Sequence, residues 1–444
     1  MKALRLGRSA IGVLIAMAML AGCGGSQSPI AAPTAVVPRG RPSAHAARPL
    51  AGAGYKVVYT FKGSPNDGAN PFAGLVATKG SLYGTTVYGG GTKSGSDYGT
   101  VFALSPVGGK DEVLHDFKGG KDGAFPYAGL VALSGKLYGT TSMGGSSNCS
   151  FGTSSGGGGC GTVFEISTVG AVKVLHKFTG FPSDGVNPHA GLLALNGTLY
   201  GTTLDGGDFK CGHSDSGGCG TVFEVSTSGK ERVLYRFKGY PHDGAYPSAS
   251  LVAENGILYG TTSGGGNGSG CSTGCGTIFE VTTSGAGYKT LYSFKGGTDG
   301  EDPQGALLAV KGALYGTTES GGATNNGTVF AVNASGTESV LYGFKGGSDG
   351  ALPFAGLVAH KGAFYGTTTK GGVDCPPSGQ CGTVFEVSTS GAEQVVHSFK
   401  GRKDGAYPVA ALLTFHGALY GTTPGALSCG SSCQWSGTVF RVTP

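Results

Sequence analysis

Charged side chains are scarce in this chain: only 13% of its 444 residues are Asp, Glu, Lys or Arg. The formal net charge of +5 comes from the first 50 residues, which hold six basic residues and no acids. Residues 51–444 carry 25 basic and 26 acidic residues and show no basic stripe. Since a nucleic-acid-binding domain usually presents a basic face, the charge pattern argues against nucleic acid as a partner.

Residues that favour helices are also poorly represented, because glycine supplies 89 of the 444 residues. Each glycine weakens a helix interior by roughly 1 kcal/mol. Collagen would need glycine at every third position and far more than the 20 prolines present. A disordered Gly/Ser chain would lack large apolar residues, yet 39% of this chain is hydrophobic. An all-β protein remains, and the glycines that recur at fixed motif positions predict many tight turns.

The N-terminus lacks a long hydrophobic run. Three basic residues precede the apolar segment 10–22, which is shorter than the roughly 20 residues of a membrane span and is typical of a secretory signal. The segment ends in Leu20-Ala21-Gly22-Cys23, which resembles the lipobox of bacterial lipoproteins. That resemblance implies that residues 1–22 are removed and that Cys23 is lipidated. A plain signal peptide with a chance cysteine is the alternative.

The segment that follows predicts where the mature protein resides. Gly24, directly after the cysteine, resembles the outer-membrane-directed class of Gram-negative lipoproteins. Residues 23–50 are rich in Ala, Pro, Ser and Arg, which is typical of a flexible tether. We therefore expect an exported lipoprotein that is held on the outer membrane, on its periplasmic side or at the cell surface, by the lipid on Cys23.

From residue 55 onward, three motifs recur in the same order seven times, and such repeats define the unit of the fold. An Asp-Gly pair is followed after 16 residues by Tyr-Gly-Thr-Thr, and then by Gly-Thr-(Val/Ile)-Phe. Only the stretch between the last two motifs varies, from 12 to 23 residues, so length variation is confined to one loop per repeat. The aspartates are Asp67, Asp122, Asp184, Asp243, Asp299, Asp349 and Asp404.

Each repeat contains four short apolar runs bounded by Gly, Asp and Pro, which is typical of β-strands. Two-residue turns such as Asn196-Gly197 and Asn255-Gly256 join two of the runs and indicate tight hairpins. Four antiparallel strands every 50–62 residues match a propeller blade. The sequence therefore predicts an all-β, seven-bladed β-propeller over residues 51–444, with a β-helix or β-solenoid as the alternative.

The chain ends bear on how the ring closes. The repeated region begins with an apolar run at 56–61 and stops at 438–442, just after a Gly-Thr-Val-Phe motif. If the Asp-Gly segment crosses between blades, the Ala-Gly-Leu-Val run is the innermost strand and the Val-Leu-Tyr run is the outermost. We prefer this phase because small residues suit the crowded axis. The first strand then completes the seventh blade and closes the ring.

The repeats resemble the choice-of-anchor GloVer tandem-repeat proteins of bacteria. The resemblance rests on Ala73-Gly74-Leu75-Val76 and its counterparts at 128–131 and 355–358, each followed by Tyr-Gly-Thr-Thr and Gly-Thr-Val-Phe. It covers nearly all of residues 55–444, although the fourth and fifth repeats depart from it at 249–252 and 305–308. The family is similar in placing varied anchors on a common repeat, and it implies no established activity.

Ten cysteines follow Cys23, and all of them lie in the variable loops. In an exported chain, an even number of locally paired cysteines predicts disulfides, each contributing about 2–3 kcal/mol. Zinc is the alternative, with Cys211, His213 and Cys219 nearest to a ligand set, but no loop offers four ligands at finger spacing. We expect no metal. The expected pairs are Cys149–Cys160, Cys211–Cys219, Cys271–Cys275, Cys375–Cys381 and Cys429–Cys433.

Residues present in every repeat are expected to be structural. The repeated aspartates suit turns in which the carboxylate bonds nearby backbone N–H groups, and the repeated Tyr and Phe suit the core. His115, His176 and His397 stand where other repeats place a tyrosine, so we interpret them as substitutes at one strand position. No Ser/His/Asp order, phosphate loop or metal-ligand motif stands out, and we expect no cofactor.

Departures from the repeat are better candidates for a site. The positions on either side of the proline in Asp-Gly-Xaa-Xaa-Pro-Xaa vary, and this segment enters the inner strand at the face that carries the cysteine loops. Aromatic and amide side chains there suit a sugar or a peptide, and ordinary loop variation is the alternative. The candidates are Asn70, Phe72, Phe125, Tyr127, Asn187, His189, Tyr246, Asp302, Gln304, Phe354 and Tyr407.

Three functions remain open. The first is a monomeric, lipid-anchored binding module with a glycan or a protein ligand at the loop-rich face. The second is a propeller hydrolase or lyase acting on glycans, for which the adjacent acids Glu301 and Asp302 are the catalytic candidates. The third is a purely structural envelope protein. Since the sequence shows no catalytic motif, binding without catalysis is preferred.

The lipid anchor can be tested directly. Replacing Cys23 with Ser removes the thiol that would carry the lipid, so the variant should appear in the soluble fraction, and globomycin should cause accumulation of the unprocessed precursor. Membrane fractionation and the mass of the N-terminal peptide report the result. Unchanged membrane retention of the variant would contradict the anchor.

Overall fold

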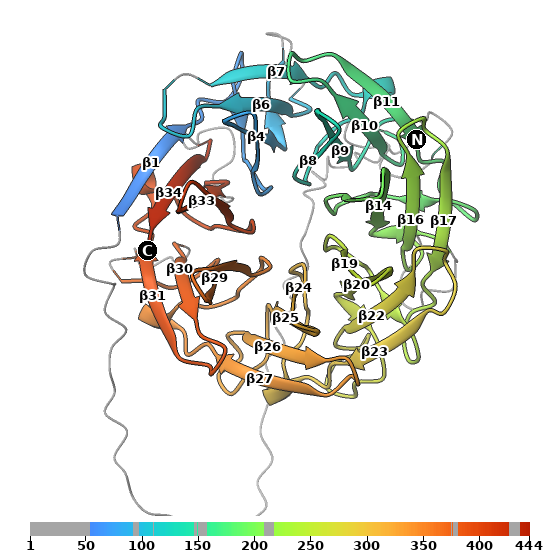
Figure 1. Cartoon of the computed structure of the whole chain (residues 1–444), viewed down its shortest axis with the longest axis vertical. Helices are drawn as coiled ribbons and strands as arrows, with labels where there is room; N and C mark the ends of the chain where they lie inside the picture. Colours follow the sequence, from blue (N-terminus) through green and yellow to red (C-terminus); the bar gives the residue numbers. More distant parts are fainter. Residues whose placement is uncertain are drawn as a thin grey trace, which may run out of the picture. The chain divides into compact units, whose positions relative to one another are not determined.

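The computed structural model describes residues 54–91, 97–109, 111–145, 149, 158–207, 217–373, 375, 381–425 and 436–444. These residues form seven four-stranded sheets that are arranged as blades around a ring (Figure 1). The prediction of an all-β, seven-bladed propeller is therefore confirmed, and a solenoid is excluded. The predicted signal peptide and tether lie outside the described residues. Within the described ranges, no helix is long and apolar enough to cross a membrane.

The first two strands of each blade run from the axis outward. The innermost strands are β3 (Val76–Thr78), β8 (Val131–Leu133), β13 (Leu193–Leu195), β19 (Val252–Glu254), β24 (Leu308–Val310), β28 (Val358–His360) and β32 (Leu413–Phe415). The second strands carry Tyr-Gly-Thr-Thr: β4 (Ser81–Thr86), β9 (Lys136–Thr141), β14 (Thr198–Thr203), β20 (Ile257–Thr262), β25 (Ala313–Thr318), β29 (Ala363–Thr368) and β33 (Ala418–Thr423).

The other two strands complete blades 1 to 7, counted in this order. The third strands begin with Thr-(Val/Ile)-Phe: β6 (Thr100–Leu104), β10 (Thr162–Ile166), β16 (Thr221–Ser226), β22 (Thr277–Thr282), β26 (Thr328–Asn333), β30 (Thr383–Val387) and β34 (Thr438–Thr443). The outer strands are β7 (Glu112–Asp116), β11 (Val172–Lys177), β17 (Glu231–Arg236), β23 (Lys289–Ser293), β27 (Glu338–Gly343), β31 (Glu393–Ser398) and β1 (Gly54–Thr60).

Short elements mark the crossings between blades. Three of them form two-stranded pairs: β2 (Gly68–Ala69) with β5 (Tyr88–Gly89), β12 (Gly185–Val186) with β15 (Asp205–Gly206), and β18 (Gly244–Ala245) with β21 (Gly264–Gly265). The others contain a 3-10 turn: η1 (Gly120–Asp122), η3 (Gly297–Asp299), η4 (Gly347–Asp349) and η5 (Arg402–Asp404).

The N-terminal strand closes the ring. β1 pairs antiparallel with β34, with Gly54 opposite Thr443, and so forms the outer edge of blade 7. Figure 1 shows β8, β19 and β24 toward the centre and β7, β17 and β27 at the rim. The preferred blade phase is thus confirmed. The inner strand is shorter than predicted, because it begins only at the last residue of the Ala-Gly-Leu-Val run.

The residues ahead of the inner strand contact the neighbouring blade instead. The first threonine of each Tyr-Gly-Thr-Thr motif donates its buried hydroxyl to a backbone carbonyl there, as Thr85 does to Ala128 O at 2.8 Å. Thr422 donates to Ala73 O at 2.9 Å, so the series runs from blade 7 back to blade 1. The remaining donors are Thr140, Thr202, Thr261, Thr317 and Thr367.

Phenylalanine pairs join the blades farther out. The Phe after each outer strand packs edge-on against the Phe in the third strand of the next blade, with ring centroids 5.0 Å apart for Phe61–Phe102 and 5.2 Å apart for Phe117–Phe164. The glycine of Tyr-Gly-Thr-Thr makes this possible, because a Cβ on Gly84 would lie 2.5 Å from the Phe102 ring. This glycine lies in mid-strand, so the prediction that the repeated glycines serve turns is wrong for it.

The repeated aspartates have the predicted turn role. Asp67 accepts hydrogen bonds from the backbone N–H of Lys62 at 2.7 Å and of Gly68 at 2.6 Å. It also accepts one from the Tyr59 hydroxyl, which comes from the preceding outer strand. At the His positions the imidazole takes the place of the phenol, with His115 3.3 Å from Asp122. Each aspartate therefore holds its crossing against the blade that precedes it.

Deleting residues 55–62 should lower the unfolding temperature of the whole domain rather than loosen one edge. The deletion removes the outer strand of blade 7, including Val58 and Phe61, which are 7% and 2% exposed and whose burial is worth about 1.5–3 kcal/mol each. Calorimetry should show a single transition at a lower temperature. Val169→Ser, at a side chain that is 85% exposed, is the control. An unchanged midpoint after the deletion would contradict closure by β1.

Candidate functional site

The residues on either side of the seven crossing prolines form what we call the crossing ring. The residue before each proline has a positive φ, between 56° and 62°. This conformation is unfavourable for bulky side chains such as Phe125 and Leu352, so the surroundings must impose it. For Asp302, the N–H donates to Cys275 O at 2.9 Å and the carbonyl accepts from Glu319 N–H at 3.0 Å. The same backbone recurs at every crossing, and only the side chains differ.

The crossing ring lies on the face that carries the cysteine loops, since Asn187 N–H bonds to Cys160 O just as Asp302 bonds to Cys275. Three of the predicted disulfides are present: Cys149–Cys160, Cys271–Cys275 and Cys375–Cys381. Cys219 is also disulfide-bonded. The other predicted partners, Cys211, Cys429 and Cys433, lie outside the described residues.

Aromatic side chains gather on one side of the crossing ring. Tyr127 stacks on His189 with ring centroids 4.1 Å apart and meets Phe72 edge-on at 5.6 Å. A second edge-on contact joins Phe125 to Tyr88 at 5.7 Å. Burial lowers the pKa of His189 to about 4, so its ring is neutral at physiological pH. Three successive crossings thus supply one continuous row of rings, Phe72–Tyr127–His189.

Polar side chains form a chain of contacts farther round the ring. Ser248 donates to Gln304 Oε1 at 2.6 Å, and Gln304 Nε2 donates to Asp302 Oδ1 at 2.9 Å. Asp302 in turn shares a hydrogen bond with Glu319. Burial, followed by the charges of Glu319 and Glu301, raises the pKa of Asp302 to about 8, and burial also raises the pKa of Glu319. Two carboxyl groups in such contact hold one proton between them.

A second acid lies between the aromatic row and the polar chain. Asn187 donates to Asp205 Oδ2 at 3.3 Å, and burial raises the pKa of Asp205 to about 7. Burial and then the charge of Asp205 raise the pKa of Tyr246. The crossing ring therefore offers neutral or weakly acidic groups beside its aromatic row.

The remaining candidates come from the crossings into blades 1, 6 and 7. Asn70 donates to the carbonyl of Pro424 at 3.0 Å, which ties blade 1 to blade 7. Phe354 and Tyr407 are both half-buried. Burial, and then the charge of Glu319, raise the pKa of Tyr407.

The structure changes the predicted pair of acids. The Glu301 carboxylate lies against the Cys271–Cys275 disulfide, with Oε2 2.9 Å from Cys271 Sγ, and Asp302 is paired with Glu319 instead. Glu319 directly follows Tyr-Gly-Thr-Thr, where the other repeats have Val87, Ser142, Leu204, Ser263, Thr369 and Pro424. An acid at that position is itself a departure from the repeat, and this signal was present in the sequence.

Comparison with known proteins adds information on the repeat and the fold. A family model described as the Gloeobacter/Verrucomicrobia repeat matches residues 47–214, 146–273 and 213–440. None of the curated proteins matches the sequence.

Several solved structures are similar in fold. An oligogalacturonate lyase in complex with manganese is 9% identical, with 88% of this chain and 96% of that chain covered and a TM-score of 0.50. The oligogalacturonate lyase of Vibrio parahaemolyticus gives the same four values. A chain of a nidogen/laminin complex is 14% identical, with 60% and 83% covered and a TM-score of 0.37. At such identities the similarity to the lyases concerns the propeller fold alone.

Replacing Asp302 with Asn should reduce the pH dependence of stability. The pKa of Asp302 is about 8 in the folded chain against 3.8 for an ordinary aspartate. Between these values the folded chain binds more protons than the unfolded chain. The free energy of unfolding therefore falls as the pH rises, by up to about 1.4 kcal/mol per pH unit for one proton.

Urea unfolding at pH 5 and pH 8 measures this effect. The Asn variant should lose less stability between the two pH values than the parent chain, whereas Glu112→Gln, at an exposed position, should behave like the parent. Equal losses in the parent and the Asn variant would contradict a shared proton at Asp302 and Glu319.

Proposed function

Because this chain belongs to the Gloeobacter/Verrucomicrobia repeat family, whose repeat builds the scaffold, we propose that its function resides where the blades differ, and that the crossing ring binds a glycan. The observation that supports this most is the convergence of unlike side chains on one identical backbone. Aromatic rings from Phe72, Tyr127 and His189 form a row, and a polar chain follows round the ring.

The chemistry of these groups suits a sugar. The apolar face of a pyranose stacks on an aromatic ring, and its hydroxyl groups both donate and accept hydrogen bonds. Tyr127 and its neighbours supply the rings. Ser248, Gln304 and Asn187 supply uncharged donors and acceptors beside them. A peptide is the second ligand class, and the experiment below distinguishes the two.

The proposed setting is the cell envelope, with the protein exported and held at the membrane by a lipid on Cys23. The disulfides support export, because such bonds persist in oxidising compartments. The tether of residues 23–50 would leave the propeller free to meet ligands. Within this proposal the protein acts as a monomer and the membrane is its fixed partner.

A glycan hydrolase or lyase is the second candidate, and the raised pKa of Asp302 is the observation that favours it. However, the two carboxyl groups of glycosidases stand about 5–10 Å apart with the sugar between them. Asp302 and Glu319 are in direct hydrogen-bond contact and leave no such space. We therefore favour binding without turnover.

Replacing Tyr127 with Ala should weaken glycan binding about tenfold or more, because the variant loses the ring that joins Phe72 to His189. An aromatic stack is worth about 0.5–1.5 kcal/mol beyond the area it buries, and 1.4 kcal/mol is a factor of ten in affinity. A glycan array with the full chain would identify the oligosaccharide, and calorimetric titration would then compare the variant with the parent.

Val169→Ala, in the turn between β10 and β11 at the opposite end of the blade, is the matched control and should bind like the parent. Binding to a peptide array but to no glycan would replace the ligand class. Release of reducing ends that Asp302→Asn abolishes would establish the enzyme instead. Full binding by the Tyr127 variant would contradict the crossing ring as the site.

A further inference from the structure

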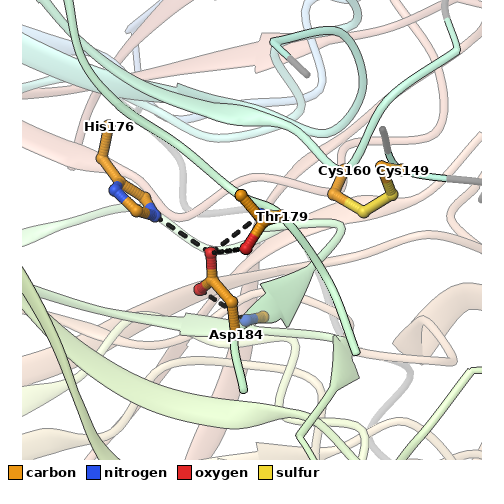
Figure 2. The surroundings of a disulfide bond; sticks show 6 residues. Cys149, Cys160, His176, Thr179 and Asp184 are labelled. Atoms are coloured by element: carbon orange, nitrogen blue, oxygen red, sulfur yellow. Dashed lines mark hydrogen bonds and ion pairs between the residues drawn. A yellow bond between two sulfur atoms is a disulfide. The ribbon is translucent and has the colours of Figure 1, made fainter. Parts of the chain in front are cut away.

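A separate cluster of polar residues lies between the outer strands of blades 2 and 3. His176, in β11, has its Nε2 3.2 Å from Asp184 Oδ2 (Figure 2). Glu231, the first residue of β17, completes a group whose potential ligand atoms all lie within 4.8 Å of one another. Three chain segments meet here, and none of these residues belongs to the crossing ring.

Rigid elements hold each of the three side chains. The register of β10 against β11 shifts between Val163 and Phe164, which leaves Leu175 unpaired and sets His176 opposite Val163. Asp184 is fixed by hydrogen bonds from the N–H and hydroxyl of Thr179 and from the N–H of Gly185 (Figure 2). Glu231 pairs with Val225 across the sheet. The group is therefore preorganised.

Burial makes the arrangement costly without a further partner. The side chains of His176 and Asp184 are 18% and 8% exposed, and Glu231 Oε1 is buried with no hydrogen-bond partner. An unpaired buried oxygen costs about 1–3 kcal/mol. Burial and then the charge of Asp184 raise the pKa of Glu231 to about 7. Arg236 is the nearby base that offsets part of this shift, and its guanidinium donates to Ser183 O at 2.6 Å.

We propose that His176, Asp184 and Glu231 form a binding site for one zinc ion. One imidazole and two carboxylates are ligands that Zn²⁺ accepts, with water in the fourth position. Bonds of about 2.0–2.2 Å in a tetrahedron place neighbouring ligand atoms about 3.3 Å apart, close to the 3.2 Å between His176 and Asp184. The Thr179 hydroxyl would remain on Asp184 as the outer hydrogen bond that orients it.

Equivalent junctions around the ring provide internal controls, because each lacks one ligand. His115–Asp122 and His397–Asp404 keep the His–Asp pair, but Val172 and Tyr55 stand at the register position of Glu231. Asp299 keeps its acid, Glu338, but has Tyr292 in place of the histidine. In the described part of the chain, the other three-ligand group is Cys271, Cys275 and Glu301, whose cysteines form a disulfide.

The test is calorimetric titration of the tag-free, oxidised full chain with zinc chloride, checked by metal analysis after dialysis. The parent should bind one zinc ion per chain. His176→Tyr, which installs the residue found at this position in other blades, and Glu231→Gln should each weaken binding at least a hundredfold. His115→Tyr should leave it unchanged. Circular dichroism and the unfolding temperature without metal verify that each variant is folded.

Zinc binding by the parent that survives in folded His176→Tyr, or a parent that binds no zinc, would overturn the proposal. A gain of function provides an independent check. Tyr292→His would complete the same ligand set with Asp299 and Glu338, and the stoichiometry should rise from one zinc ion to two. A stoichiometry that stays at one would contradict the ligand set as stated.

Discussion

A buried threonine hydroxyl that reaches the backbone of the next blade is the contact on which this ring depends. It recurs seven times, from Thr85 onward to Thr422, and the last one returns to the first blade. Because the acceptor is a main-chain carbonyl close to the axis, the segments that carry it must stay small. A Cβ added to Gly129 would lie 2.9 Å from the carbonyl oxygen of Gly74 in the neighbouring blade. The spacing of the blades follows from this contact.

That constraint divides the residues of each repeat into two classes. The threonines, the paired phenylalanines, the mid-strand glycine and the turn aspartate all serve contacts between blades or crossings, so every blade needs them. Side chains that none of these contacts uses are free to differ. They occur at the crossing ring and at the outer junctions. Both the glycan proposal and the zinc proposal rest on such differences, against a backbone that repeats.

Much of this fold could be predicted from the sequence. Motif spacing predicted seven blades, and the position of the first strand predicted closure by β1. The disulfide pairs that lie within the described residues could be predicted too, because their partners are close along the chain. Asp67 and its counterparts could be interpreted as turn residues because each motif contains its own hydrogen-bond partners. These features are local, or repeat often enough to be recognised.

Contacts between blades could not be predicted in the same way. Asp302 and Glu319 are 17 residues apart and meet only because a crossing lies against the end of a second strand. His176 and Glu231 come from different blades, and the strand register decides that they meet. The glycine of Tyr-Gly-Thr-Thr looked like a turn residue, since the ring that covers it comes from another strand. Spacing alone does not describe how two sheets pack face to face.

The most direct measurement of the central claim is hydrogen–deuterium exchange of the full chain with and without its glycan. If function lies where the blades differ, the ligand should slow exchange in the crossings around residues 70–72, 125–127, 187–189 and 302–304. The two-residue hairpins at the opposite end, such as Asn196-Gly197, should exchange as before. Protection confined to those hairpins, with none at the crossings, would contradict the account.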